Sequence, residues 1–184
     1  MKNKKIFIII YIAVFLILAG FISLVLLGGN GKNPVSLTNI YMNKYQKLDK
    51  KTVSNIKYAF SDELTPTQEE KYQNIIKKQY EKIAYQITNK QTTESDALIT
   101  VEFNVYDLAS VMEKANNFIE VYGDKFQKNG EFDTYKAIDY KLKALQEADE
   151  RVTYSIVFTY YKDKNTWKLI ELSDTDLQKL NGTY

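Results

Sequence analysis

Residues 97–108 read ALITVEFNVYDL, and this stretch decides the fold because its side chains alternate with a period of two. Ile99, Val101, Phe103 and Val105 share one face, and Thr, Glu and Asn residues occupy the positions between them. This alternation predicts a β-strand with one buried face. The other segments of the chain are therefore placed around a sheet.

Three further segments show the same alternation. The first begins at Ile83, and the polar run 89–96 connects it to the strand at 97–108, so the two are expected to pair as an antiparallel hairpin. Residues 151–162 (RVTYSIVFTYYK) and 166–173 (TWKLIELS) are separated by three polar residues, which predicts a second hairpin.

Helical spacing of apolar residues predicts helices before, between and after these hairpins. At Thr65 the run TPTQ gives a threonine N-cap, a proline at the first helical position and a glutamine at the third. Asp107 is the expected cap of a later helix, Gly123 its expected end, and Asn129–Gly130 a turn. The expected helical faces consist of Leu37, Ile40, Tyr41, Tyr45 and Leu48 in a helix over 36–48; Val53, Ile56, Ala59 and Phe60; Tyr72, Ile75, Ile76 and Tyr80; Leu108, Val111, Met112, Ala115, Phe118, Ile119 and Tyr122; and Tyr135, Ile138, Leu142 and Leu145.

A last short helix is expected to start at Ser173 or Asp174 and to stop near Gly182. Because neighbouring strands are joined by hairpins and not by helices, the predicted class is α+β. We expect a curved four-stranded antiparallel sheet packed on amphipathic helices.

The N-terminus carries a different signal. Residues 6–29 contain no charge, and a helix of about 22 such residues spans roughly the hydrocarbon thickness of a bilayer. Lys2, Lys4 and Lys5 precede this segment, which places the N-terminus in the cytoplasm by the positive-inside rule. The sequence thus predicts a cytoplasmic N-terminus (1–5), a retained transmembrane signal anchor (6–29), a linker (30–35) and an extracytoplasmic domain (36–184).

Two other interpretations of the leader stay open. One is a cleaved signal peptide, although the apolar run is longer than usual and only glycines offer small residues for cleavage. The other is a domain that faces the cytoplasm. Lipid attachment is excluded because the chain has no cysteine to accept the lipid.

The composition excludes several classes of chemistry. The 184 residues include no cysteine and no histidine, which removes thiolate–zinc sites, iron–sulfur clusters and Ser-His-Asp or Cys-His catalysis. The four lysines up to Lys32 leave 21 of the 25 basic residues against 23 acidic ones, so the domain has a net charge of −2. This near-neutral charge predicts no nucleic-acid partner. We expect no cofactor and no metal.

The C-terminal segment TYSIVFTYYKDKNTWKLIELSDTDLQKLNGTY (153–184) carries a family resemblance. With the order of elements, it resembles small membrane-anchored or lipoprotein domains of Gram-positive bacteria with the cone-shaped nuclear-transport-factor-2-like (cystatin-like) fold. The match covers about the last 35 residues well. Such domains are mostly of unassigned function, and the fold includes isomerases, dehydratases and non-catalytic scaffolds, so the resemblance implies a fold and no particular activity.

Aromatic residues on the strands are the candidate ligand or partner contacts. The chain has 15 tyrosines, and several fall on or beside predicted strands, where a phenol can point into a cavity or an interface. The alternative is that these rings pack in the core with a satisfied hydroxyl, because aromatic residues favour strands in any case. The candidates are Tyr85, Tyr106, Tyr154, Tyr160 and Trp167, with Tyr161 beside them.

Carboxylates are the general acid/base groups that remain. Glu102, Asp107 and Glu171 lie nearest the predicted sheet, but Glu102 alternates toward solvent and Asp107 is explained as a helix cap. The cluster SDTD at 173–176 lacks the ligand spacing of a calcium loop, and helix capping explains it more simply. No catalytic residue is therefore assigned.

The sequence predicts a single-pass protein of the cell membrane with an extracellular, non-catalytic binding or scaffolding domain. Its expected partners are the lipid bilayer through residues 6–29 and an envelope protein or a second copy of the chain, as in the bitopic scaffold subunits of type IV secretion systems. The alternative is a small-ligand site, or an isomerase- or dehydratase-like activity, inside the cone.

Overall fold

The computed structural model describes residues 32–48 and 64–184. The expected helix at 53–60 and the expected membrane anchor at 6–29 lie outside these residues. Within the described ranges, no helix has the length and apolar character needed to cross a membrane. The helices are α2 (Pro34–Gln46), α4 (Pro66–Glu81), α5 (Leu108–Val121), the short 3₁₀ helix η2 (Gly123–Phe126), α6 (Thr134–Gln146) and α7 (Asp174–Asn181). The strands are β1 (Ala84–Thr92), β2 (Asp96–Tyr106), β3 (Gln127–Lys128), β4 (Glu131–Phe132), β5 (Arg151–Asp163) and β6 (Thr166–Leu169).

The predicted α+β class and the two predicted hairpins are confirmed. A four-stranded antiparallel sheet has the order β1-β2-β5-β6, and β3 and β4 form a separate two-stranded ribbon that the sequence analysis did not anticipate. Asn129 and Gly130, with φ of 55° and 84°, form the turn of that ribbon. Positive φ at both central residues is what a two-residue hairpin turn requires.

The two faces of the sheet differ as the alternation in 97–108 predicts. On the inner face, Ile99, Val101 and Phe103 of β2 are buried, as are Phe158 and Tyr160 of β5. Helices α2 and α7 contact β2 from this side, and α7 also contacts β5. The outer face of β2 and β5 carries only exposed or half-buried residues.

Strand β1 is longer than predicted. The run 89–96 was expected as a connection, but β1 continues to Thr92 and the turn takes only residues 93–95. The Thr93 hydroxyl accepts hydrogen bonds from the backbone N–H groups of Ser95 and Asp96, at 3.3 and 3.0 Å. These bonds form the turn at residues 93–95, several residues later than expected. A bulge at Thr88, between Ile87 and Asn89, adds one residue to β1 relative to β2.

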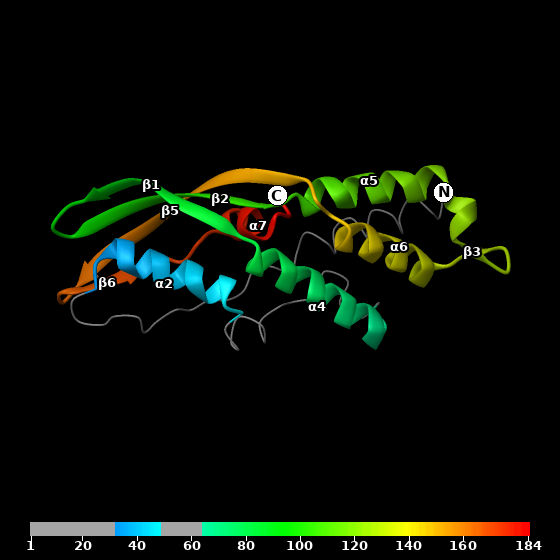
Figure 1. The fold of residues 1–184 in the computed structure, drawn as a ribbon, viewed down its shortest axis with the longest axis horizontal. Helices are drawn as coiled ribbons and strands as arrows, with labels where there is room; N and C mark the ends of the chain where they lie inside the picture. The colour runs from blue at the N-terminus through cyan, green and yellow to red at the C-terminus, as the bar shows by residue number, and fades with distance from the viewer. Residues whose placement is uncertain (1–31, 49–63) are drawn as a thin grey trace.

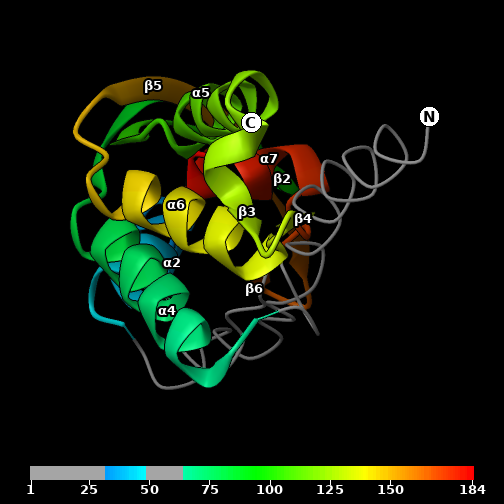
Figure 2. The ribbon, with the colours of Figure 1, turned by 90° about the vertical axis from the view of Figure 1, so that its right-hand side faces the viewer.

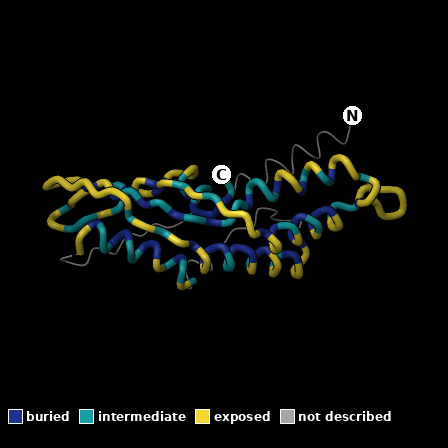
Figure 3. The backbone as a smooth tube through the Cα atoms, turned by 45° about the horizontal axis from the view of Figure 1, so that its top comes forward, coloured by how far each residue is buried: buried dark blue, intermediate teal, exposed yellow. Residues whose placement is uncertain are grey.

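The molecule is elongated, with the sheet toward one end and the pair α5–α6 toward the other (Figure 1). Helix α2 runs beneath the sheet in this view and α4 lies beneath α6, and the end-on view shows α6 and α4 side by side (Figure 2). The turn between β1 and β2 and the turn between β3 and β4 are the exposed tips at the two ends (Figure 3).

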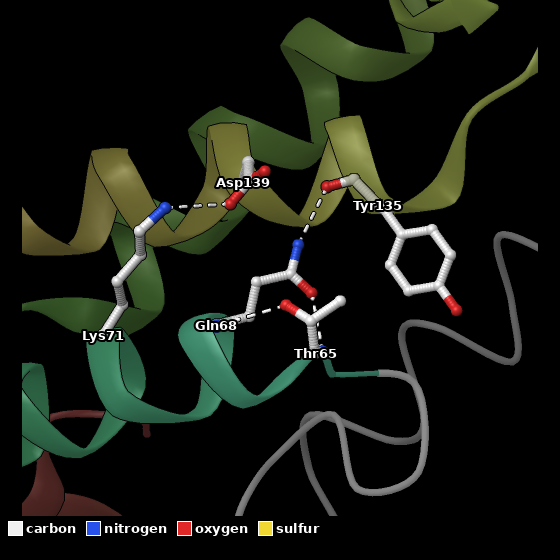
Figure 4. A network of polar contacts seen from close by, with 5 residues as sticks. All are labelled: Thr65, Gln68, Lys71, Tyr135 and Asp139. Carbon is white, nitrogen blue, oxygen red and sulfur yellow. Dashed lines mark hydrogen bonds and ion pairs between the residues drawn. The ribbon is translucent and has the colours of Figure 1, made fainter.

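The start of α4 has the predicted capping box. The Thr65 hydroxyl accepts from the Gln68 backbone N–H at 3.3 Å, and the Gln68 side-chain oxygen accepts from the Thr65 backbone N–H at 3.0 Å. The Gln68 amide nitrogen also donates to the backbone carbonyl of Tyr135 in α6, at 3.1 Å (Figure 4). Lys71 and Asp139 form an ion pair between the same helices at 3.0 Å, but it is exposed to water and contributes little. Through the hydrogen bond from Gln68 to the Tyr135 carbonyl, the capping box of α4 therefore also positions α6.

Replacing Thr65 with alanine is expected to lower the free energy of unfolding by about 1 kcal/mol, because the Gln68 N–H loses its acceptor. Chemical denaturation of the Thr65→Ala variant measures the loss. Thr67→Ala is the matched control, since Thr67 is exposed in the same turn and caps nothing. Equal stability of the two variants would contradict the assigned role of the cap.

Three details of the predicted helices were wrong. Helix α2 begins at Pro34, not at 36, because the Asn33 side chain caps it by accepting from the Ser36 N–H at 2.8 Å. Gly123 does not end α5 in a left-handed conformation; it opens η2 after Tyr122. Tyr135 was placed on the buried face of α6, but it is 56% exposed, whereas Lys141 is only 4% exposed.

The C-terminal helix is fixed by one buried glutamine. The Gln79 side chain of α4 donates to the carbonyls of Tyr106 and Asn181, at 3.0 and 2.8 Å, and accepts from the Tyr106 N–H at 2.9 Å. Gly182 ends α7 with a φ of 70°, and its carbonyl accepts from the Ala109 N–H at 2.9 Å. Together, these hydrogen bonds join α4, β2, α5 and α7. We call the group of Gln79, Tyr106, Ala109, Asn181 and Gly182 the C-terminal clamp.

Candidate functional site

The candidate site is the outer face of the sheet. Four exposed apolar residues lie there, on β2, on β5 and directly after β6: Leu98, Val157, Tyr161 and Ile170, with exposed fractions of 40, 47, 42 and 49%. Polar residues are the rule on a solvated sheet face, so a group of large apolar side chains indicates an interaction surface. We call these four residues the outer patch.

The register places the members of the outer patch next to one another. Leu98 pairs with Thr159, and Val157 and Tyr161 flank Thr159 on the same face of β5. The Ile170 N–H donates to the Thr159 carbonyl at 2.8 Å, directly after β6. Diagonal neighbours on one sheet face lie about 7–8 Å apart, within contact range of large side chains. Thr159 is therefore the centre of a continuous apolar surface.

Tyr106 lies at the opposite end of the outer face and differs from the patch in its surroundings. The Arg151 guanidinium carbon is 4.7 Å from the centre of its ring, and the Lys78 ammonium is 4.8 Å from it. Arg151 also donates to the backbone carbonyls of Lys82 and Asn104, both at 2.7 Å. Tyr106 thus forms cation–π contacts within the domain.

The other four candidate contacts do not gather with Tyr106. Tyr85, Tyr154 and Tyr160 lie on the inner face of the sheet, and Trp167 packs against the hydrophobic core from β6. The Tyr85 hydroxyl donates to Asn39 at 3.2 Å, and the Tyr154 hydroxyl donates to the Tyr184 carbonyl at 3.0 Å. This arrangement favours the packing alternative for these residues, in which the ring is in the core and the hydroxyl is satisfied.

Tyr160 is the most enclosed of the candidates. It is 1% exposed, and its hydroxyl is 2.8 Å from the Thr38 hydroxyl of α2. Burial raises the pKa of the Tyr160 phenol to about 12, although the hydrogen bond with Thr38 opposes the increase. Burial likewise raises the pKa values of Tyr41, Tyr45 and Tyr80 well above 10. The core formed by the inner face, α2 and α4 therefore holds neutral phenols.

The carboxylates considered as acid/base groups are not buried. Glu102 accepts from the Gln86 amide at 3.1 Å on the outer face, Asp107 caps α5 by accepting from the Ser110 N–H at 2.9 Å, and Glu171 is exposed. Across residues 32–48 and 64–184, no Asp or Glu falls in the buried class. The Ser173 side chain caps α7, as the capping interpretation of SDTD predicts, and no acidic cluster suited to a metal occurs in the described part of the chain.

The outer patch was largely missed from sequence. Tyr161 was named, but Leu98, Val157 and Ile170 were not. The sequence did contain one indication of the patch. Leu98 and Val157 are apolar at outward-facing strand positions, where a solvated face is expected to be polar. The strands alone did not indicate that these positions would become neighbours, because that depends on the β2–β5 register.

No protein-family model matches the chain, and no curated protein sequence matches it. A crystal structure of the "putative lipoprotein (ycdA)" of Bacillus subtilis is similar with a TM-score of 0.43 and 14% sequence identity over 83% of this chain. The chain spans about half of that protein, 48% of its length.

Proposed function

We propose that this chain is a non-catalytic binding or scaffolding protein of the cell envelope, held at the membrane by residues 6–29, and that it binds a protein partner through the outer patch. The observation that carries the proposal is the group of Leu98, Val157, Tyr161 and Ile170 on one sheet face. Covering such a surface contributes about 25 cal/mol per Å² of apolar area removed from water. Tyr161 is the member of the outer patch whose residue type is enriched at the centres of protein interfaces.

We propose in addition that the domain adopts the nuclear-transport-factor-2-like cone. An antiparallel sheet with α2 and α7 on one side is compatible with a nuclear-transport-factor-2-like cone. The extracellular location is supported by the uncharged segment 6–29 and by the lysines that precede it.

A single charge in the outer patch is expected to abolish partner binding. In the Val157→Lys variant, the ammonium would have to be desolvated at the centre of the interface, which we expect to reduce binding at least tenfold. The measurement is chemical crosslinking on intact cells that express the full-length protein, with the yield of each crosslinked species compared to that of the unmodified chain. Thermal unfolding checks that the variant is folded.

Val121→Lys is the matched control for this experiment. Val121 is 72% exposed on α5, so the same substitution is made on another exposed valine away from the sheet. We expect the crosslinked species to persist in Val121→Lys and to disappear in Val157→Lys. Equal yields in both variants would refute the proposal.

The alternative function, a small-ligand site or an isomerase-like activity in the interior, has one supporting observation. Several hydroxyls point inward, with Tyr41 and Tyr45 3.3 Å apart and Tyr160 bonded to Thr38. An isomerase of this kind also needs a carboxylate base, and the described residues place none in the interior. Binding through the outer patch is therefore the better supported proposal.

A further inference from the structure

We propose that the protein partner of this domain supplies an extended segment that pairs with the free edge of β5 and adds one strand to the sheet. The inference rests on the proposed function, because it states how the partner of the outer patch binds. Its support begins with the unequal lengths of two neighbouring strands: β5 has 13 residues, whereas β6 has four.

Most of β5 has a neighbouring strand on one side only. Its ladder with β2 covers residues 151–161, whereas its ladder with β6 covers only residues 160–163. Among the described residues, none forms a backbone hydrogen bond with residues 152–158 on the β6 side. In Figure 1 this part of β5 is the upper border of the ribbon between β1 and α5, and no other described element lies beyond it. We call residues 152–158 the open edge.

The backbone groups that point out of the open edge belong to Thr153, Ser155 and Val157. In an antiparallel strand, successive residues direct their N–H and C=O groups to opposite sides. The Thr159 carbonyl points to the β6 side, because it accepts from the Ile170 N–H at 2.8 Å. Steps of two along β5 from Thr159 reach the three residues named first, and all three are exposed. Their donors and acceptors are available to another strand.

The open edge lacks the features that protect a free strand edge, which are charges, prolines and bulges. Residues 152–158 read VTYSIVF, with no charge and no proline, and their register with β2 has no shift. Arg151 precedes them, but its guanidinium donates to the carbonyls of Lys82 and Asn104 on the other side of β5. Strand β1, at the opposite edge of the sheet, has a bulge and carries Lys90. The sheet can therefore accept one strand, at β5.

The side chains along the open edge describe the segment that fits it. On the outer face, side chains of an added strand would lie beside Val157 and extend the outer patch. On the inner face they would lie beside Tyr154, whose ring centre is 5.8 Å from that of Tyr184. Because the open edge carries no charge, we expect an uncharged segment with β-branched or aromatic residues. In strand addition, backbone bonds provide affinity and alternate side chains provide specificity.

A second copy of this chain is a less suitable source of the added strand. Two β5 edges related by a two-fold axis would run in opposite directions. The Thr38 and Tyr160 hydroxyls, 2.8 Å apart, fix the start of α2 beside the end of β5, so the two copies would begin at opposite ends of the pair. Residues 30–33 connect α2 to the proposed anchor and span at most about 14 Å. Both connections would reach one bilayer only if the paired strands lay flat on it, whereas a segment of another protein has no such constraint.

A proline at position 155 tests strand addition and leaves the existing sheet intact. The Ser155 N–H points out of the open edge, so Ser155→Pro removes a donor that the ladder with β2 does not use. Proline is tolerated on edge strands where the N–H faces solvent. Ser155→Val is the matched control, because it changes the side chain at the same position and keeps the N–H. Thermal unfolding checks that both variants are folded.

The measurement is chemical crosslinking on intact cells that express the full-length protein, with the yield of the partner adduct compared among the variants. We expect Ser155→Pro to reduce this yield by about tenfold or more, because the added strand loses a backbone bond and meets the proline ring. We expect Ser155→Val to stay within about twofold of the unmodified chain, since the edge keeps its donors.

The other outcomes separate this inference from the proposed function. Equal yields for Ser155→Pro and Ser155→Val would rule out strand addition; if Val157→Lys still removed the adduct, the proposed function would stand through the outer patch alone. If neither Ser155→Pro nor Val157→Lys changed any adduct, the proposed function would fail as well. If the adduct lost from Ser155→Pro consisted of two copies of this chain, the assigned occupant would be wrong.

Amide hydrogen exchange tests the open edge without a partner and does not depend on the folding of a variant. The N–H groups of Tyr154 and Ile156 point to β2, whereas those of Ser155 and Val157 point away from it. In the full-length protein in detergent micelles, followed by NMR, we expect Ser155 and Val157 to exchange about a hundredfold faster than Tyr154 and Ile156. Equal protection of all four would show that the chain itself covers this edge, which would overturn the inference.

Discussion

Replacing Gly182 with alanine is expected to lower the free energy of unfolding by about 3–5 kcal/mol, which is a large part of the stability of a typical domain. A Cβ at this position would lie 2.0 Å from the Tyr106 carbonyl oxygen and 2.4 Å from the Gln79 side-chain nitrogen. The φ of 70° adds about 1 kcal/mol or more, because L-residues avoid this conformation. Urea denaturation of the folded domain measures the loss.

The size of this effect follows from the C-terminal clamp. The Tyr106 oxygen belongs to the backbone of β2, so it cannot move away as the end of a flexible side chain would. If Gly182 moves instead, the carbonyls of Tyr106 and Asn181 lose the buried Gln79 amide, and the Ala109 N–H loses its acceptor. Each buried polar group left without a partner costs about 1–3 kcal/mol.

Two other glycines serve as controls that separate the steric clash of the added Cβ from the cost of the positive φ. Gly130 has a φ of 84° and open space around an added Cβ, so Gly130→Ala reports the backbone conformation alone. Gly123 has open space and no positive φ, so Gly123→Ala is expected to be nearly neutral. The expected order of destabilisation is Gly182, Gly130 and then Gly123. A loss at Gly182 no larger than that at Gly130 would show that the clamp is not rigid.

Raising the pH above about 10 is expected to destabilise the domain steeply. An exposed tyrosine of the unfolded chain loses its proton near pH 10, whereas burial keeps the pKa of Tyr160 at about 12 in the folded domain. Between these values the folded state binds more protons than the unfolded state, so stability falls as the pH rises. Below pH 10 both states are protonated, and the full stability is retained.

The expected loss from Tyr160 alone is roughly 2–3 kcal/mol between pH 10 and 12. Tyr41, Tyr45 and Tyr80 add to it, because burial raises their pKa values in the same direction. The measurement is the free energy of unfolding in urea as a function of pH, with tyrosinate absorbance as a second readout.

Tyr160→Phe is expected to flatten the alkaline slope, since one titrating group is removed. The Thr38 hydroxyl keeps its hydrogen bond to the Pro34 carbonyl at 3.0 Å, so the substitution leaves no orphaned group there. Tyr161→Phe is the matched control, because it removes one phenol from the exposed face and leaves the buried phenols in place. A free energy of unfolding that stays constant between pH 10 and 12 would contradict the burial of these phenols.

The sequence predicted those elements whose signals are local. The alternation in 97–108 needs only neighbouring residues to place a strand, and the Thr65 capping box needs only four. Both are confirmed. The cap at Asp107 and a turn at Asn129–Gly130 were predicted on the same basis and are also present, although the two short strands that this turn joins were not predicted.

Features set by tertiary contacts were not predictable in this way. Tyr135 and Lys141 have residue types that suggest the opposite of their observed burial, because the packing of α6 against its neighbours decides which residues are covered. The outer patch depends on the pairing of β2 with β5, and the C-terminal clamp joins positions 79, 106 and 182. Neither the outer patch nor the C-terminal clamp can be recognised from about ten consecutive residues of the sequence.

The bulge at Thr88 also affects how crowded copies of this domain avoid aggregation. A sheet edge offers unpaired backbone groups that can template strand addition by another chain. Here one edge is β1, which is distorted by the bulge and carries the charged residue Lys90. The other edge is β6, which is only four residues long. Bulges, charges and short strands all discourage edge-to-edge polymerisation. A concentrated solution of the domain should therefore remain free of growing β-ribbons.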